Sequence, residues 1–576
     1  MANFSFRQKS FTSVFSLLLI FFSSLSYPTL GLAMDRHGGT LVLSSTSDPK
    51  SFNDILAQET SSTMVTSNIF EGLTMVNAQT LQVEPLLAQS WDVQDDGKTW
   101  IFHLRDDVKF NDGQPFTADD VVFTFHQLIY NEKIPSSARD IFSIQGKIFD
   151  VKKIDDHTVQ FQLPVRFAPF LRSMTQPILP KHKLQSAVDD GKFNFTWGID
   201  TPPQEIVGTG AFRLTEYSPG ERLVFERNPY YWKKSKEGDA LPYLDKIIYV
   251  IVQNQDVAIL KFLEGDLDYV GVRGSDYPLL KPVEEQKNFR IYETGPDFGS
   301  NFIVFNQNSS INPKTTKPFV DPVKLRWFTN VQFRKAVAHS IDRQKIIEIL
   351  NNGLGYPQFG PLSPSIGFFY NPQVEEYAYD LKQAKDILMQ AGFQDRDGDG
   401  VIEDPEGNKI EFNLFTNSGS QERVQIAAIV RHDLQMLGMK VNFLAIEFNS
   451  LVGKLTSSFD WDAVILGLTG GGVDPHFGKN VWHSSGQLHM WYPHQEAPVT
   501  SWEARVDEIF NLGVQELDDN KRKILYDEYQ KIVADQLPLI YTVLDSNMFA
   551  IRNKFGNLRP TSYGGAFHNI EEIYLK

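Results

Sequence analysis

The sequence has no cysteine among its 576 residues, and it has fewer basic than acidic side chains. The missing cysteine excludes disulfide bonds, thiolate metal sites, a cysteine nucleophile and a lipid attached to cysteine. The 55 Lys and Arg against 71 Asp and Glu give a net charge of −16, which repels phosphate, so no nucleic-acid partner is expected. Hydrophobic residues make up 41% of the chain, which is enough to exclude a disordered protein.

Residues 1–33 have the pattern of an export signal. Arg7 and Lys9 are their only charged residues, the apolar run 14–22 follows, and small or turn-forming residues lead to Ala33. The run is shorter than the about 20 residues that a membrane span needs, so we expect cleavage near Ala33 in preference to a retained anchor. No later segment is long and apolar enough to span a bilayer, and no cysteine can carry a lipid. The sequence therefore predicts a mature protein that is soluble in the periplasm.

Helices and strands alternate in the second half of the chain. Four-residue steps between apolar side chains predict one long helix over 330–352. Asp380 can cap a second helix that ends near Ala391, and a third helix over 422–437 leads into a strand over 440–444. In the first half, Thr117 can cap a helix whose first turn is acidic. These are α/β units.

Eight short segments follow one another in a fixed order and spacing. They are 85–91 (PLLAQSW), 96–105 (DGKTWIFHLR), 112–121 (DGQPFTADDV), 207–212 (VGTGAF), 228–232 (NPYYW), 330–336 (NVQFRKA), 340–343 (SIDR) and 379–385 (YDLKQAK). With them the sequence resembles the family 5 extracellular solute-binding proteins, the dipeptide- and oligopeptide-binding components of ABC importers. The resemblance covers most of residues 38–570, and the export signal agrees with it independently.

The resemblance implies an α/β fold of two lobes joined by a hinge, with an extra domain on the first lobe. Lobe I would comprise residues 34–75, 205–297 and 545–576, the extra domain residues 76–204, and lobe II residues 298–544. A small-molecule or peptide ligand would bind between the lobes, and closure would present the complex to membrane permease subunits. We expect the protein to act as a monomer.

A glycine-rich loop is the first candidate for ligand binding. The strand 463–466 runs into it, and backbone amides at such a strand end can meet a ligand. Its candidate residues are Gly470, Gly471, Asp474 and His476. In peptide-binding relatives this loop carries an Asp that pairs with the ligand's α-ammonium, but Gly471 occupies that position here. This difference argues against a free dipeptide as the ligand. The ligands that remain are longer or modified peptides, sugars, or an amine that pairs with a different acidic residue. The alternative is a flexible surface turn.

Aromatic side chains and the lobe crossover supply the other candidates. Trp482 and Trp491 belong to a cluster of tryptophans over 461–502, where their faces can stack on a sugar ring or cover a cation, although core packing is the common role of tryptophan. The remaining candidate residues follow the first strand or lie near the expected crossover: Ser47, Asp48, Phe52, Phe298 and Asn301.

An acidic loop over 395–406 fits the twelve-residue calcium pattern D-x-D-x-D-G-x5-E. The predicted ligands are Asp395, Asp397, Asp399, the carbonyl of Val401 and Glu406, with Glu403 at the ninth position. The loop is solitary and leads into a strand, so the alternative is an acidic turn without an ion. No cofactor is required, and a bound Ca²⁺ would be structural. The histidines 476, 483, 489 and 494 lack the spacing that makes ligands converge on a transition metal.

Motifs of catalysis are missing. The sequence contains no GxSxG, HExxH or GxxxxGK[ST], and a glycine-rich dinucleotide motif does not follow any strand. We therefore predict a binding protein for peptides or peptide-like ligands and not an enzyme. The alternatives are a binding protein of the same fold for oligosaccharide, nickel or haem and, with less support, an exported hydrolase.

Overall fold

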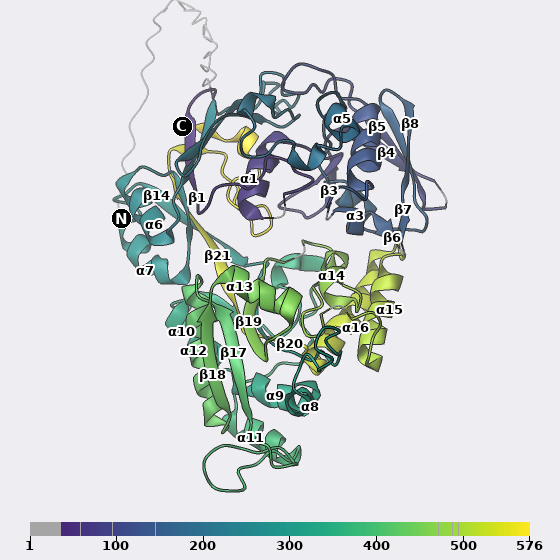
Figure 1. The fold of residues 1–576 in the computed structure, drawn as a ribbon. Helices are drawn as coiled ribbons and strands as arrows, with labels where there is room; N and C mark the ends of the chain where they lie inside the picture. The colour runs from purple at the N-terminus through teal and green to yellow at the C-terminus, as the bar shows by residue number, and fades with distance from the viewer. Residues whose placement is uncertain are drawn as a thin grey trace, which may run out of the picture. The chain divides into compact units, whose positions relative to one another are not determined.

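The computed structural model shows how the predicted elements assemble (Figure 1). It describes residues 36–57, 59–94, 96–136, 138–144, 146–470, 472–486, 488–493 and 495–576. The predicted export signal and Gly471 lie outside the described residues. His37–Lys576 forms one unit of the chain. In the described part of the chain, no helix has both the length and the apolar character that a membrane crossing requires.

A four-stranded sheet brings the start of the described chain together with segments from its middle. Its strand order is β1 (Thr40–Ser45), β12 (Lys246–Ile251), β11 (Arg222–Arg227) and β10 (Phe212–Ser218). β1 runs parallel to β12, whereas β10 and β11 form an antiparallel hairpin that turns at Gly220. Alternate residues of β1 are buried, as expected for a strand with one face against a core.

A second four-stranded sheet is entirely antiparallel. Its strand order is β4 (Ala88–Val93), β5 (Thr99–Leu104), β9 (Thr158–Gln162) and β8 (Asp150–Asp155). α2 (Ala118–Phe123) follows β5, and its predicted cap is confirmed, because Thr117 and the Asp120 carboxylate form a reciprocal capping box. Phenylalanines fill the core between these elements.

A five-stranded sheet forms the core of the second half of the chain. Its order is β18 (Lys440–Ile446), β17 (Glu411–Asn417), β19 (Ala463–Leu468), β15 (Ser300–Phe305) and β20 (Leu539–Tyr541). β17 is parallel to both β18 and β19, while β15 is antiparallel to its neighbours. The parallel pair confirms the predicted α/β unit, and α12 (Gln421–Met436) is its crossover helix.

The single helix predicted over 330–352 is wrong, because two helices occupy this range. α9 (Val331–Ser340) ends at Ile341, whose backbone is extended, and α10 (Arg343–Leu350) begins after Asp342. The Asp342 carboxylate accepts a hydrogen bond from the Lys345 amide at 3.0 Å and so caps a new helix. Apolar periodicity does not detect such a break when both helices bury the same face.

Two neighbouring strands continue directly into the five-stranded sheet. β14 (Phe289–Pro296) leads into β15, and β20 leads into β21 (Val543–Arg552). β14 and β21 pair with each other, and the Asp297 amide donates to the Asp545 carbonyl at 2.9 Å. β13 (Tyr269–Val272) and β16 (Gly355–Pro357) also pair with β21. The predicted domain boundaries, two of which fall at these crossovers, stay predictions.

The remaining elements cover the sheets. The longer helices are α1 (Thr60–Ile69), α5 (Lys181–Asp189), α6 (Gln255–Glu264), α8 (Pro322–Thr329), α11 (Leu381–Gln390), α15 (Ser501–Gly513) and α16 (Asp519–Gln536). The shorter helices are α3 (Ala138–Ile141), α4 (Phe170–Ser173), α7 (Tyr277–Leu280), α13 (Phe448–Gly453) and α14 (Lys479–Trp482). Short paired strands are β2 (Thr74–Val76), β3 (Val83–Pro85), β6 (Ser143–Ile144), β7 (Lys147–Ile148), β22 (Phe555–Gly556) and β23 (Tyr574–Leu575).

Candidate functional site

Two of the cavities between these elements have linings suited to a ligand. The larger, of about 640 Å³, lies between α1, β2 and residues 564–571, and we call it the first cavity. The smaller, of about 220 Å³, lies beside the glycine-rich loop that follows β19, and we call it the loop cavity. Pockets for small molecules are typically concave and mostly apolar with a few polar groups, which describes the loop cavity.

Strand ends and short helices build the loop cavity. It is lined by Phe298, Ser300, Ile366, Leu468, Gly470, Asp474, Trp482, Tyr529, Leu539 and Tyr541, among others. Four of the predicted ligand residues are therefore together here: Phe298, Gly470, Asp474 and Trp482. Gly470 has a positive φ of 85°, and a Cβ at this position would lie 2.4 Å from the Phe298 carbonyl oxygen. Only glycine lets the loop pass so close to that backbone.

Asp474 forms a buried ion pair. Its Oδ1 accepts hydrogen bonds from Arg522 Nη2 at 2.8 Å and from the His476 amide at 3.0 Å. The two side chains are at most 2% exposed. Burial alone would lower the pKa of Arg522, but the charge of Asp474 outweighs it and raises the pKa, so the guanidinium is charged at neutral pH. Asp474 thus joins the glycine-rich loop to α16, and its other oxygen, Oδ2, has no hydrogen-bond partner among the described residues.

His476 is buried and uncharged at neutral pH. Burial lowers the pKa of this imidazole to about 3, and the charges of Lys479 and Arg522 lower it further. Its ring packs edge-on against Phe167, with the centroids 5.4 Å apart. His476 therefore acts as a packing group here, and a ligand contact for it stays a prediction.

The two predicted tryptophans pack on each other, with ring centroids 5.5 Å apart. Trp482 lines the loop cavity, and its contact with ligand stays a prediction. Trp491 is 1% exposed and donates its Nε1 hydrogen to Glu503 Oε1 at 3.0 Å. The structure gives Trp491 the core role that the sequence left open, and its contact with ligand stays a prediction.

The residues predicted after the first strand lie away from the linings of both cavities. The Asp48 carboxylate accepts hydrogen bonds from the Tyr217 hydroxyl at 3.0 Å and the Gly220 amide at 2.9 Å, so it holds the turn of the β10–β11 hairpin. Phe52 is completely buried and packs edge-on against Tyr217. The Ser47 carbonyl accepts a hydrogen bond from Ser45. Ligand contacts of these residues remain predictions.

Asn301 belongs to a charged cluster near the crossover. Its side chain accepts from Arg423 Nε at 3.1 Å and donates to Glu422 at 3.2 Å. Burial, followed by the negative charge of Asp545, raises the pKa of Glu422 to about 7. The sequence analysis did not find Glu422 and Asp545, because these two acidic residues are far apart in the chain and neither belongs to a motif.

The first cavity contains polar residues that the sequence analysis did not name. Glu71 Oε2 accepts the Trp232 indole hydrogen at 3.2 Å, and Oε1 accepts from the Tyr231 hydroxyl at 3.3 Å. Lys233 forms an ion pair with Glu571 in the same lining. The segment 228–232 contributed to the family resemblance, so its aromatic pair was the signal that could have pointed to this cavity.

The protonation of Glu71 should make stability depend on pH. Burial raises the pKa of this carboxyl from 4.5 to about 7, so the folded protein binds more protons than the unfolded chain between these values. The free energy of unfolding therefore falls as pH rises from about 4.5 to about 7. We expect Glu71→Gln to reduce this fall by up to about 3 kcal/mol, measured by urea denaturation at pH 5, 6, 7 and 8.

Other buried acids, including Glu422, remain in the Glu71→Gln variant and contribute equally to both pH profiles. The difference between the profiles therefore reports Glu71 alone. Glutamine keeps the shape and one carbonyl acceptor for Trp232. Parallel profiles for the parent and the variant would show that Glu71 is ionised throughout.

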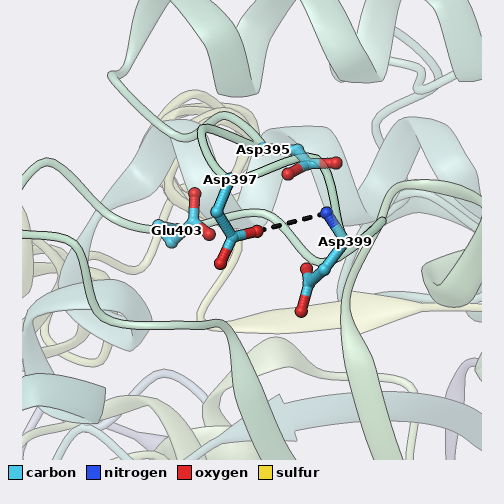
Figure 2. Close-up of side chains that lie close together, drawn as sticks. All are labelled: Asp395, Asp397, Asp399 and Glu403. Carbon is cyan, nitrogen blue, oxygen red and sulfur yellow. Dashed lines mark hydrogen bonds between the residues drawn. The ribbon is translucent and has the colours of Figure 1, made fainter.

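The acidic loop brings four carboxylates together (Figure 2). Oxygen atoms of Asp395, Asp397, Asp399 and Glu403 lie within 4.8 Å of one another. Lys409 Nζ lies 2.9 Å from Asp397 and also pairs with Asp399, and its hydrogen bond to Asp399, followed by that of the Val401 amide, lowers the pKa of Asp399. Glu406, the ligand predicted at the twelfth position of the loop, instead contacts Arg326 at 2.5 Å. The Val401 amide donates to Asp399 at 2.9 Å. The calcium site stays a prediction.

If the acidic loop binds calcium, the protein should melt at a higher temperature in CaCl₂ than in EGTA, because an ion that binds only the folded state stabilises that state. Asp397→Asn should abolish the difference. The measurement is differential scanning calorimetry of the mature protein, with MgCl₂ as the control for ionic strength. Identical melting temperatures with and without Ca²⁺ would reject the prediction and leave Lys409 as the counter-ion of the loop.

The α/β sheets and the two adjacent crossovers agree with the fold of two-lobed binding proteins. The chain belongs to the bacterial extracellular solute-binding proteins, family 5, because the model of that family ("family 5 Middle") matches residues 82–488. The resemblance found in the sequence is thereby confirmed, as is the predicted fold class. The family is one of extracellular binding proteins.

Individual relatives span nearly the whole chain. A probable ABC transporter-binding protein of Deinococcus radiodurans is 29% identical over 501 residues, which are 82% of each chain. The oligopeptide-binding protein AppA of Bacillus subtilis is 27% identical over 559 residues, 94% of this chain and 92% of AppA. The solved structure of AppA in complex with a nonapeptide covers 94% of this chain and all of that one, with a TM-score of 0.75 and 25% identity.

Proposed function

We propose that this protein is the periplasmic receptor of an ABC importer, which captures peptides or peptide-like compounds between its two lobes and delivers them to a membrane permease. The observation that carries the proposal is the similarity to AppA, an oligopeptide-binding protein, over 94% of the chain. The loop cavity supports it, because an apolar pocket with few polar groups suits peptide side chains better than a sugar.

The protein works by binding alone. Ligand contacts both lobes in the closed form and so shifts the population from open to closed. No bond is made or broken, and the ligand is released unchanged, so the protein is not an enzyme. The permease and the ATPase that drives import are separate chains, and the receptor reaches them as a monomer. We infer that the export signal is cleaved near Ala33 and directs the protein to the periplasm.

The test is mass spectrometry of the molecules that the mature protein retains when it is purified from its native periplasm. We expect intact peptides. The control is the same preparation unfolded in guanidinium, dialysed and refolded, which should carry none. Recovery of an oligosaccharide, nickel or haem would replace peptides as the ligand, and recovery of chemically cleaved products would show an enzyme.

A further inference from the structure

We propose that four residues form a latch that holds the two lobes closed without help from a ligand. The latch consists of Phe167 and Ala168 on one side and of His476 and Val514 on the other. The inference rests on the open–closed motion of the proposed function, and it adds a contact, made by the protein alone, that favours the closed form.

The first side of the latch belongs to the core beside the antiparallel sheet of β4, β5, β9 and β8. Phe167 follows β9 closely and is completely buried, with its ring centroid 5.7 Å from that of Phe149. Phe149 packs in turn edge-on against Phe170, with the centroids 5.8 Å apart. Because protein cores are packed as densely as crystals, these rings fix the position of Phe167 and of its neighbour Ala168.

The second side belongs to the part of the chain between the two crossovers, residues 298–542. Phe510 on α15 packs in the core of the five-stranded sheet. Val514, which follows the last residue of α15, does not, because its side chain is 4% exposed and lies in the same core as Phe149 and Phe167. Among the described residues between the crossovers, it is the only hydrophobic one in that core.

Two direct contacts join the two sides. The Ala168 amide donates a hydrogen bond to the Val514 carbonyl at 2.7 Å. The His476 ring packs edge-on against Phe167, with the centroids 5.4 Å apart. One hydrogen bond, one ring contact and the burial of one valine side chain favour closure, yet together they are few enough for the two sides to separate.

Val514 is the side chain that inserts into the opposite core. Leu512 before it and Leu517 after it are both 45% exposed. Leu517 covers the turn at Gly97, where a Cβ would lie 3.0 Å from Leu517 Cδ1. A change at Val514 therefore acts on the latch, whereas the same change at Leu512 does not.

A buried ion pair fixes the second side of the latch. Arg522 donates from Nη2 to Asp474 Oδ1 at 2.8 Å and from Nε to the Gly513 carbonyl at 2.9 Å. Asp474 Oδ1 also accepts the His476 amide at 3.0 Å, so Arg522 holds both His476 and Val514 in place. Asp474 lines the loop cavity as well, so the wall of that cavity and the latch share one support.

The free energy of the latch adds to the free energy that a ligand supplies. All partners of the latch belong to the chain, so its contacts form when the lobes close and break when they open. A contact present in only one of two conformations shifts the population towards that conformation. We therefore expect the closed form to be the main population of the ligand-free protein.

The test measures the distance between two spin labels by double electron–electron resonance in refolded, ligand-free mature protein. The chain has no cysteine, so Lys152→Cys and Lys521→Cys introduce the only two labelling sites. The two lysine side chains are 63% and 67% exposed and lie on β8 and α16, one in each of the parts that the latch joins. We expect one main, short distance in the parent.

The decisive variant is Val514→Asp, which should raise the ratio of open to closed protein at least about 100-fold, because closure would bury a carboxylate. Val514→Ala should raise the ratio about tenfold through lost burial alone, and a tryptic digest of casein should restore its short distance. The matched control is Leu512→Asp, which places the same charge on α15 and should leave the parent distribution unchanged. Melting curves confirm that each variant is folded.

Equal distance distributions for the parent and both Val514 variants would overturn the latch. So would a Leu512→Asp variant as open as Val514→Asp, or a ligand-free parent that is mainly open. If the casein peptides closed such an open parent, the proposed function would stand without the latch. If Val514→Ala opened and the peptides left it open, the latch would stand and the proposed function would be overturned.

Discussion

Asp474→Asn should lower the free energy of unfolding by about 3–5 kcal/mol, as expected when one partner of a buried ion pair is removed. The variant leaves the Arg522 guanidinium charged in a site where its side chain is 2% exposed. The remaining partners of that guanidinium are the Gly513 carbonyl at 2.9 Å and Asp519 at 3.2 Å, and the latter is largely exposed. They cannot replace the charge of Asp474.

Urea denaturation at pH 7 measures this loss. The matched control is Glu508→Gln, which breaks the partly exposed pair between Arg505 and Glu508 on α15 and should cost less than about 1 kcal/mol. The double variant Asp474→Asn with Arg522→Met should recover much of the loss, because no buried charge is left unpaired. A single variant as stable as the parent would show that the pair is not formed in solution.

Arg343→Met should by itself lower the free energy of unfolding by about 3–5 kcal/mol. Arg343 is 4% exposed, and burial lowers its pKa to about 9, so it stays charged at neutral pH. It donates to the backbone carbonyls of Ala338, Ile341, Tyr377, Gln358 and Tyr541. Methionine fills the volume but leaves these buried carbonyls without a donor.

Arg343→Lys should be nearly as unstable, because one ammonium group cannot reach the carbonyls that the planar guanidinium contacts together. The control is Arg222→Met, which removes an arginine whose side chain is 53% exposed and paired with Glu216 at 2.8 Å, and it should change stability by less than about 1 kcal/mol. Chemical denaturation of all three variants checks the prediction. Equal stability of Arg343→Lys and the parent would contradict it.

The contacts of Arg343 also give a structural reason for the segment 340–343, one of the eight that carry the family resemblance. In the segment Ser-Ile-Asp-Arg, Asp342 caps α10 and Arg343 binds the carbonyls that the end of α9 leaves free. The motif marks the break between two helices. Periodicity alone predicted one helix here, since it measures only which face is apolar.

Elements with local signals were predictable. The caps at Thr117 and Asp380, the helix over 421–436 and the strand after it depend on side chains within a few residues of the backbone groups that they satisfy. The glycine-rich loop was predictable for the same reason, because a strand followed by several glycines changes direction at once. Four of the predicted ligand residues, two of them in this loop, line the loop cavity.

The partners of the candidate site were not predictable. Asp474 was a candidate for the ligand, yet its Oδ1 is bound by Arg522, 48 residues away in the chain. Trp232 and Glu71 are separated by 161 residues. Ion pairs and hydrogen bonds over such separations depend on which strands become neighbours, and no local pattern encodes that choice.

The amino-acid sequence by itself determined the family, through eight segments in order. Its lack of cysteine also excluded disulfide bonds, thiolate metal sites and a cysteine nucleophile. The sequence also determined several helices and strands, because caps, turns and apolar periodicity act over a few residues. Only the tertiary structure decided which polar atoms are paired and where cavities remain. The reason is that burial and pairing are properties of the packed chain: the same Asp, Tyr or Trp is a ligand group, a counter-ion or part of the core according to the side chains that folding places against it.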